Sequence, residues 1–545
     1  MSLRAYRIAP TDSTTFLPRL FGRHGAVASN SYLSANAGAD VLKAGGNAVD
    51  AAVAMTLVEG LVNPQMNTLG GECPVLVRLA GQSRVIALNG NMAAPMAATP
   101  DAFRARGYDD VPDADIMAAG VPATLSALVT ALNKWGTMSF RDVSAPAREL
   151  AARGFPVSAG LRQQHKFGLA ALERKFKSDW PASAKLYLPD GKVPEVGQLL
   201  RNEALARTLD YLAHAKDPHE AFYRGDIAAE IAKFSAARGG LLVREDLAAF
   251  ETRVEAPVSL RFGDVELFKC GFWSQGPAEL QTIALMARFD LKAMGPGSAD
   301  YCHLLVEAMK LAFADTWLHV CDPGMSRVTP AQMLDDAYLA SRAKVIDMKR
   351  AQHPAAGEIP RGGGTVYLTT ADERGMMLSF IQSNYMGFGS GVVVPGTGIS
   401  LQNRGAGFGL ESGHANEVGP RKRPFNTIIP GFLTRGGEPV MSFGVMGGNM
   451  QPQGHIQMII RLVDHKQNPQ ACTDAPRWIV NHDFSVSVED NVPAGVKDEL
   501  ARRGHRVVPS DRPMFGFGGA QLIHRLEDGY CAASDHRKDG CAIGF

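Results

Sequence analysis

The sequence predicts an α+β fold in which helices cover layers of sheet. Apolar residues recur with helical spacing over residues 33–61, 301–320 and 450–465. Between the last two of these segments, residues 365–382 have the pattern of two β-rich runs joined by a turn. Apart from one glycine run, no linker divides the chain, and we find no internal repeat. Strands and helices that share one undivided body favour sheet layers with helices packed against them.

The N-terminal helical region carries its own start and stop signals. Residues 33–44 are ended by Gly45-Gly46, and Asn47 is a suitable N-cap for a second helix over residues 48–61. Apolar residues surround this second segment on all sides, which indicates that it is buried. We expect residues 1–24 to form an irregular arm before these helices.

The later elements are predicted in the same way. Residues 301–320 place apolar side chains at helical spacing, and residues 450–465 do so again. Residues 365–371 and 376–382 flank a polar tetrapeptide that ends in glycine, which is a hairpin signal.

Composition excludes several classes of function. The 545 residues carry a formal net charge of +1, so neither a nucleic acid nor a membrane surface is expected as a partner. No apolar run of about 18 residues predicts a spanning helix, and the arginines near the N-terminus enclose no apolar core of a secretory signal. The seven cysteines are scattered and odd in number, which favours a reducing compartment. We therefore expect the protein in the cytoplasm.

One short segment suggests catalytic chemistry. Gly362-Gly363-Gly364 leads directly into Thr365, the first residue of a β-rich run. Cleavage of the Gly364–Thr365 bond would give Thr365 a free α-amino group beside its own hydroxyl, which is a self-contained base and nucleophile. Taken alone, the pattern favours a plain surface loop followed by a strand, because glycine clusters are usually loops.

Six motifs spread along the chain strengthen the catalytic interpretation. In order and spacing they resemble the γ-glutamyltranspeptidase family of N-terminal-nucleophile (Ntn) hydrolases, over residues 25 to 545. The motifs are Gly45–Ala52, His303–Asp315, Lys422-Arg423-Pro424, Gly447-Gly448, Asp474-Ala475-Pro476-Arg477 and Ser534–Gly544.

The resemblance implies a four-layer αββα sandwich and synthesis as a proenzyme. Cleavage before Thr365 would separate residues 1–364, the large subunit, from residues 365–545, the small catalytic subunit. The two subunits would remain associated as one αββα body. A homodimer stays open as a further level of assembly.

The resemblance also implies roles for residues near the nucleophile. Gly447 and Gly448 stand where backbone N–H groups would hold a developing oxyanion, although a turn that needs positive φ explains them as well. Ser383 stands where the family has a threonine that contacts the nucleophile. Asn384 and Tyr385 follow it and are expected to line the pocket, unless they only lead from a strand into a loop.

The substrate-binding positions depart from the family pattern. Asn91 replaces the arginine that grips the α-carboxylate of the substrate, and Gly407 replaces the aspartate that binds its α-amino group. Asn426 and Thr427 occupy the place of two serines at the acyl-binding site, where a structural role is a close alternative. Arg404 is an added cation beside Gly407. The segment 407–427 is short, so we expect the family's lid to be missing.

These observations predict a self-processing Ntn amidohydrolase or acyltransferase that forms an acyl-Thr365 intermediate on a small-molecule amide. Because both charge anchors are absent, we expect a non-standard acyl donor whose carboxylate is held by Arg404. An ordinary γ-glutamyl hydrolase or transpeptidase is the alternative, and an unprocessed binding protein is a second one. We interpret His455 as a packed helix residue, since it has no catalytic partner in the sequence. No nucleotide motif or metal-ligand spacing occurs, so no cofactor and no metal are expected.

Overall fold

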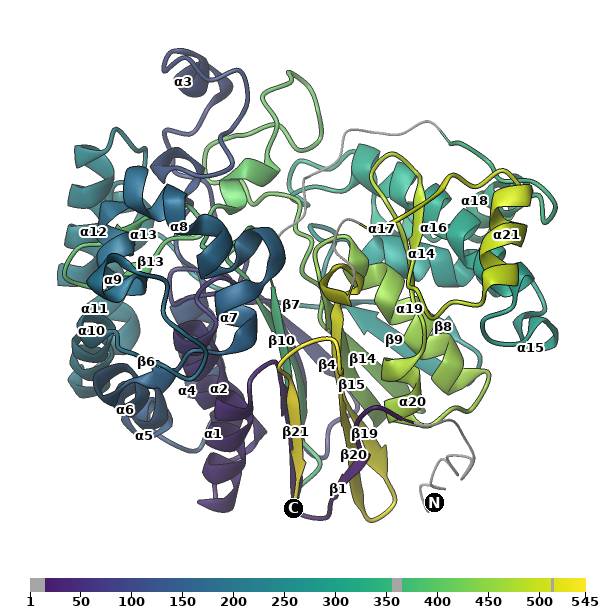
Figure 1. Ribbon diagram of the computed structural model, residues 1–545, viewed down its shortest axis with the longest axis horizontal. Coiled ribbons are helices and arrows are strands. Elements are labelled where there is room, and N and C mark those ends of the chain that lie inside the picture. Colours follow the sequence, from purple (N-terminus) through teal and green to yellow (C-terminus); the bar gives the residue numbers. More distant parts are fainter. Residues whose placement is uncertain (1–14, 355–364, 511–513) are drawn as a thin grey trace.

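Two seven-stranded antiparallel sheets lie face to face in the centre of the molecule, and helices cover the outer face of each (Figure 1). This arrangement confirms the expected four-layer αββα sandwich. The computed structural model describes residues 15–354, 365–510 and 514–545.

The first sheet contains the strand that follows Thr365. Its strand order is β21 (Cys541–Gly544), β2 (Gly25–Ser29), β10 (Val366–Asp372), β11 (Met377–Gln382), β3 (Val75–Arg78), β4 (Val85–Asn89) and β7 (Arg253–Glu255). The expected hairpin is β10–β11, in which Val366 pairs with Gln382 and Thr370 with Leu378.

The second sheet carries the strand that leads to Gly447. Its strand order is β1 (Leu20–Gly22), β20 (Gly529–Ser534), β19 (Gly519–Leu526), β15 (Glu438–Met446), β14 (Gly431–Arg435), β9 (Val265–Lys269) and β8 (Val258–Phe262). Strand β1 corrects the expectation that residues 1–24 are irregular throughout. Leu20 pairs with Ala532. As an edge strand, this segment gains backbone hydrogen bonds that an irregular arm would not make.

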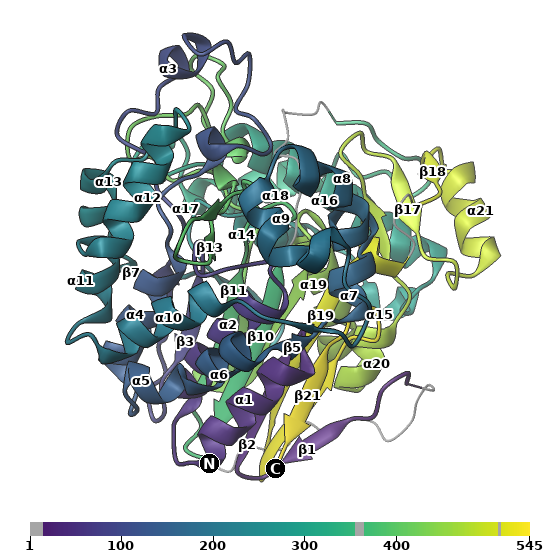
Figure 2. The same ribbon diagram turned by 60° about the vertical axis from the view of Figure 1, so that its left-hand side comes forward.

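The outer face of the first sheet is covered by helices from the N-terminal half of the chain. Helix α1 (Tyr32–Lys43) and helix α2 (Ala48–Val62) lie against this sheet, as the turned view shows (Figure 2). Asn47 and Asp50 form a capping box at the start of α2, and all but one of the α2 residues are buried, as the all-round apolar pattern predicts. The remaining helices of this side are α3 (Pro100–Arg104), α4 (Thr124–Trp135), α5 (Phe140–Val143), α6 (Ala145–Arg153), α7 (Ala159–Gln163), α8 (Leu169–Ser178), α9 (Pro181–Tyr187), α10 (Glu203–His214), α11 (Pro218–Tyr223), α12 (Asp226–Ala237) and α13 (Arg244–Ala248).

The outer face of the second sheet is covered by helices α14 (Gly276–Met286), α16 (Ala299–His319) and α19 (Met450–Val463). The last two confirm the helices expected over residues 301–320 and 450–465. Around them lie α15 (Leu291–Met294), α17 (Pro330–Met333), α18 (Asp336–Ala343), α20 (Pro469–Asp474) and α21 (Ala494–Arg502). Short pairs and a triplet complete the strands: β5 (Phe155–Pro156) with β6 (Leu199–Leu200), β12 (Val393–Val394) with β13 (Ile399–Ser400), and β16 (Trp478–Val480), β17 (Val486–Val488) and β18 (Val507–Val508).

Three apolar layers hold the sandwich together. One lies between the first sheet and its helices, and another lies between the second sheet and its helices. A third layer, which includes Ala28, Leu76, Trp273, Phe432 and Ile523, lies between the two sheets.

The segments before and after Thr365 are interleaved rather than side by side. Strand β10 hydrogen-bonds to β2, from the N-terminal segment, and to β11, from the C-terminal one. In the second sheet, β14 likewise pairs with β9. Subunits built from these segments would share two continuous sheets, which is a physical reason for them to stay associated after cleavage. Among the described residues, no helix has both the length and the apolar character needed to cross a membrane.

Candidate active site

Thr365 lies immediately before β10 and is 1% exposed. Its Oγ1 is 3.3 Å from the Oγ of Ser383, which follows β11 directly. The hairpin register explains this approach, because the pairing of Val366 with Gln382 brings their outer neighbours together. Gly364, the other half of the expected cleavage site, lies outside the described residues.

Ser383 is held in place by its surroundings. Its backbone N–H donates to the carbonyl of Glu72 at 3.0 Å, and its own carbonyl accepts from the Glu72 N–H at 3.1 Å. Its Oγ accepts a hydrogen bond from the N–H of Tyr385 at 2.8 Å. Tyr385 has a φ of +78°, in the left-handed region that non-glycine residues rarely adopt. A sharp turn therefore directs this N–H at the hydroxyl beside Thr365.

The Gly447-Gly448 turn connects β15 to α19 next to the start of β10. Met446 packs against Val366 and Met66, which places the turn beside the residue that follows Thr365. The φ angles of the two glycines are +131° and +61°, both in the region that favours glycine.

The hydrogen bonding of this turn leaves its donors available. The carbonyl of Gly448 accepts from the Gln275 side chain at 2.8 Å and from the Gln451 N–H at 3.1 Å. No hydrogen bond donated by the N–H of Gly447 or Gly448 occurs within the described part of the chain. Free donors at the start of a helix are suited to an oxyanion.

Arg404 is fully buried at the start of a short 3-10 turn, Arg404–Gly407, and its charge is already paired. Its Nε donates to the carboxylate of Glu72, and its Nη1 donates to the Oγ1 of Thr427 at 3.1 Å. The guanidinium lies 4.2 Å from the centre of the Tyr385 ring. Its Nη2 has no hydrogen-bond partner among the described residues. The side chains of Glu72, Tyr385, Arg404 and Thr427 thus meet beside Ser383, and the last three of them were predicted from the sequence.

Glu72 is a site residue that the sequence analysis missed. It is fully buried, and its second carboxylate oxygen accepts from the N–H of Met92 at 3.3 Å. The signal that could have found it is a lone acidic residue between Gly70-Gly71 and an apolar strand, where a charge needs a partner. Gln275, which contacts Gly448, was missed as well.

Asn91 and Asn426 bond mainly to each other and to the backbone. The Nδ2 of Asn426 donates to the Oδ1 of Asn91 at 2.8 Å, and Asn91 donates to the carbonyl of Pro424 at 3.0 Å. Asn384 behaves similarly, because it donates to the carbonyl of Pro64 and accepts from the hydroxyl of Thr68. These three asparagines brace the segments around the site, and their contact with a substrate stays a prediction.

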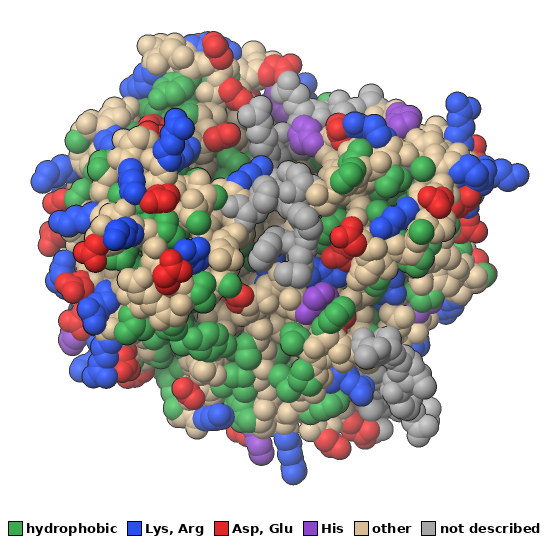
Figure 3. Space-filling view, in the orientation of Figure 1, with side chains coloured by type: hydrophobic (Ala, Val, Ile, Leu, Met, Phe, Trp, Pro, Cys, Tyr) green, Lys and Arg blue, Asp and Glu red, His purple; other side chains and the backbone are tan. Residues whose placement is uncertain are grey.

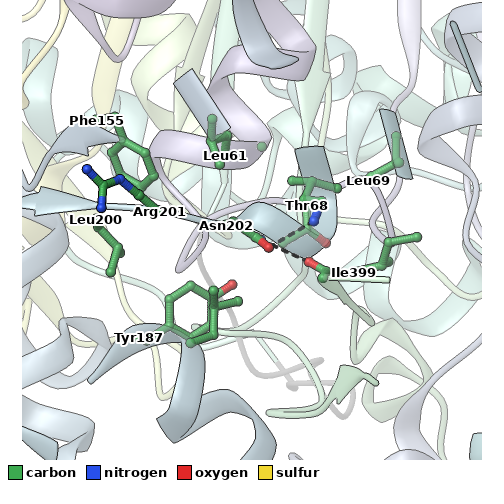
Figure 4. A pocket seen from close by; sticks show the side chains of 13 residues that line it. Leu61, Thr68, Leu69, Phe155, Tyr187, Leu200, Arg201, Asn202 and Ile399 are labelled. Carbon is green, nitrogen blue, oxygen red and sulfur yellow. Dashed lines mark hydrogen bonds between the residues drawn. The ribbon is translucent and has the colours of Figure 1, made fainter. Parts of the chain in front are cut away.

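One cavity beside this region, of about 20 Å³, is lined by Val366 and Met446, which adjoin Thr365 and Gly447. A smaller one, of about 10 Å³, is lined by Thr68, Tyr187 and Asn202 among others (Figure 4). At that size it holds at most one water molecule. A cleft of about 670 Å³ is lined by Gly407, Phe408 and Phe425 among others. Residues of the short segment 407–427, which we expect to leave the pocket without a lid, thus line this open cleft.

Figure 3 shows cationic and anionic side chains interspersed over the visible face, in keeping with the near-zero net charge.

Loss of the Arg404 charge is expected to destabilise the fold strongly. In Arg404→Leu, Glu72 would remain buried without its counter-charge, which costs about 3–5 kcal/mol in the free energy of unfolding. Urea denaturation measures the change. The double variant Glu72→Gln/Arg404→Leu is the control and should recover most of the loss, because neither charge then remains. A loss below about 1 kcal/mol in the single variant would contradict the pairing.

Comparison with known proteins places this site in a family. The family model described as γ-glutamyltranspeptidase matches residues 34–545. The chain is 32% identical to the glutathione hydrolase-like YwrD proenzyme of Bacillus subtilis, over 96% of this chain and 99% of that protein. It is also 32% identical to the oxamate amidohydrolase proenzyme of Klebsiella pneumoniae, over 96% and 98% of the two chains. The structure of a cephalosporin acylase from Bacillus halodurans superposes with a TM-score of 0.92, at 36% identity over 99% of this chain and 98% of that one. The chain therefore belongs to the γ-glutamyltranspeptidase family and is a self-processing Ntn amidohydrolase or acyltransferase.

Proposed function

We propose that Thr365 is both the processing residue and the catalytic nucleophile. The single observation that carries this proposal is the position of its hydroxyl, buried at the start of β10 and 3.3 Å from Ser383, beside a glycine turn with free N–H groups. A buried hydroxyl next to a second hydroxyl and to unused donors is suited to acyl transfer.

Maturation would begin with attack of the Thr365 Oγ1 on the carbonyl carbon of Gly364. The C–N bond between the two residues breaks as the ester forms, and the nitrogen becomes the α-amino group of Thr365. Water then hydrolyses the ester, which leaves a carboxylate on Gly364 and restores the hydroxyl. The products are residues 1–364 and 365–545.

Catalysis would reuse the same hydroxyl. The α-amino group takes the proton of Oγ1 as the oxygen attacks the substrate amide. The N–H groups of Gly447 and Gly448 bind the oxyanion, and the proton passes to the departing amine. Water or a second amine then takes the acyl group from Thr365, which gives hydrolysis or acyl transfer.

The acyl donor that fits best is small and carries a carboxylate without an α-amino group. Nη2 of Arg404 has no partner among the described residues, and the Thr427 hydroxyl lies next to this guanidinium. Guanidinium and hydroxyl donors suit a carboxylate. Glu72 supplies most of the negative charge that Arg404 needs, so we expect one further carboxylate to be bound with modest strength. That one relative acts on oxamate and others are acylases supports donors of this kind.

An ordinary γ-glutamyl substrate is the second candidate, and one observation favours it. Glu72 is a buried carboxylate beside Arg404, so the pair contains both charges that an amino-acid head group requires. Glutathione hydrolases are among the relatives, for example one from Escherichia coli at 31% identity over 96% of this chain and 92% of that protein. An uncleaved binding protein is a further alternative, which intact mass distinguishes.

The donor preference is expected to separate these candidates. With the processed enzyme, kcat/KM for a glutaryl anilide should exceed that for the γ-glutamyl anilide by about tenfold or more, because an unpaired ammonium costs about 1.5–3 kcal/mol. Ammonia release from oxamate tests a shorter donor on the same preparation. Arg404→Lys keeps the charge but loses the planar fork, so it should reduce the use of both donors, which carry the same distal carboxylate. A tenfold preference for the γ-glutamyl compound would establish the second candidate instead.

Cellular context is part of this proposal. The seven cysteines, at positions 73, 270, 302, 321, 472, 531 and 541, are all free, and only Cys541 is not fully buried. Free thiols throughout the chain favour a reducing compartment, so we assign the enzyme to the cytoplasm, either as a single pair of subunits or as a homodimer of such pairs.

A further inference from the structure

Three charged or titratable side chains meet inside the apolar layer between the second sheet and its helices. Lys269 ends β9, Glu279 lies in the first turn of α14, and His455 lies in α19. All three are 0% exposed. The Nζ of Lys269 and the Nδ1 of His455 each lie 2.7 Å from the same carboxylate oxygen of Glu279.

The hydrogen bonds define the protonation of the histidine. The N–H of Val445 donates to the Nε2 of His455 at 2.8 Å, so this nitrogen is the acceptor. In the neutral ring the proton is then on Nδ1, which donates to Glu279 at 2.7 Å. The same nitrogen lies 2.8 Å from the Nζ of Lys269, and both groups donate to the one Glu279 carboxylate. Burial lowers the pKa of His455 to about 4, which keeps the ring neutral near pH 7. Burial also lowers the pKa of Lys269, to about 8, against the opposing effect of Glu279.

Val445 is the point at which this network reaches the site. Val445 pairs with Ala520 of β19 on one side of β15, but pairing with β14 on the other side extends no further than Phe443. Beyond that point the Nε2 of His455 accepts the hydrogen bond of the Val445 N–H. Val445 is two residues before Gly447. Gly454 allows the close approach of α19, because a Cβ there would lie 2.7 Å from the Val445 side chain.

The Gly448 end of the turn is held from α14, the helix that carries Glu279. Gln275 is the N-cap residue of α14, one turn before Glu279, and its Nε2 donates to the carbonyl of Gly448 at 2.8 Å. The same nitrogen donates to the carbonyl of Thr427. Helix α14 thus acts on both ends of the Gly447-Gly448 turn: Glu279 holds His455 of α19, which bonds Val445 before the turn, and Gln275 bonds Gly448 itself.

We propose that Gln275, Glu279, Lys269 and His455 are positioning residues for the reaction, which orient the N–H groups of Gly447 and Gly448 toward the oxyanion. The inference rests on the proposed role of that turn. A buried ionic cluster is commonly no more stabilising than apolar residues of the same volume, so stability alone is a weak reason for it. A fixed direction for two backbone donors is a stronger one, since the value of such donors depends on their geometry.

The test compares His455 with a second buried histidine. His505 also lies near a lysine and a glutamate, with its Nδ1 3.1 Å from Lys310 and 3.8 Å from Glu307, but it packs against α16, away from the turn. His455→Leu removes the acceptor for Val445, His455→Gln supplies a side-chain oxygen that can replace it, and His505→Leu is the matched control. Each variant is purified as processed enzyme and its melting temperature is recorded.

We expect kcat of His455→Leu to fall by about 10- to 100-fold with KM within about twofold, because the lost interaction acts only in the transition state. His455→Gln should recover most of kcat, and His505→Leu should keep it. Equal kcat in His455→Leu and His505→Leu would overturn the inference.

Gln275→Leu supplies a second measurement that leaves no charge unpaired, for use if His455→Leu does not fold. Its kcat should fall by about tenfold at nearly unchanged KM, and an unchanged kcat would also overturn the inference. A wild-type enzyme without acyl-transfer activity would instead refute the proposed function, so the two failures are distinguishable.

Discussion

Replacement of Thr365 by alanine is expected to leave a single chain of 58.3 kDa that has no measurable activity. The hydroxyl is the proposed attacking group in processing and in turnover, so its removal stops both. Loss of a nucleophile of this kind costs at least about four orders of magnitude in kcat. Mass spectrometry of the purified protein and an anilide assay measure the two effects.

Two observations control for misfolding and for the cleavage site. Thr365→Ser keeps the hydroxyl and should still be cleaved, with some activity. N-terminal sequencing of the small chain from the wild type should give Thr-Val-Tyr-Leu. An active enzyme whose small chain starts elsewhere would show that Thr365 is not the nucleophile.

Replacement of Gly448 by valine is expected to lower kcat by about 100-fold or more, since one oxyanion donor is worth roughly 3 kcal/mol. Gly448 has a φ of +61°, which a β-branched residue does not adopt without strain. The turn must therefore rotate, and its N–H groups then point away from the substrate carbonyl. Steady-state kinetics on processed protein measure the effect.

Gly436→Val is the matched control for backbone strain. Gly436 has a φ of +57° in the turn between β14 and β15, and a Cβ there would meet no atom within 4 Å. Both variants therefore carry similar local strain, but only one carries it beside Thr365. Comparable kcat values in the two variants would place the oxyanion site elsewhere.

Local sequence signals were sufficient for the four helices and the hairpin that the sequence predicted. The caps of α2 and the turn of the β10–β11 hairpin depend on residues within a few positions of each other, so they can be inferred without tertiary contacts. Strand β1 was missed because β20, the strand with which it pairs, lies about five hundred residues away. A three-residue strand has no periodic pattern of its own.

The candidate site was predictable where its residues lie close together in the sequence. Thr365 and Ser383 lie eighteen positions apart on one hairpin, so a local register brings their hydroxyls together. Arg404 was recognised as a cation near the substrate, but its counter-charge was not, because Glu72 is more than three hundred positions earlier. His455 was interpreted as a packed helix residue, and its bonds to Glu279 and Val445 depend on how α14 and α19 meet.

By itself the sequence determined the α+β class, the family resemblance and the threonine that follows the glycine run. These rest on residue type and short-range order, which one chain displays directly. Only the tertiary structure decided that Arg404 is neutralised by Glu72 and that a buried lysine, glutamate and histidine stand behind the Gly447-Gly448 turn. Such pairings depend on which distant segments are packed together, and burial in a low-dielectric interior is what turns that proximity into a strong interaction.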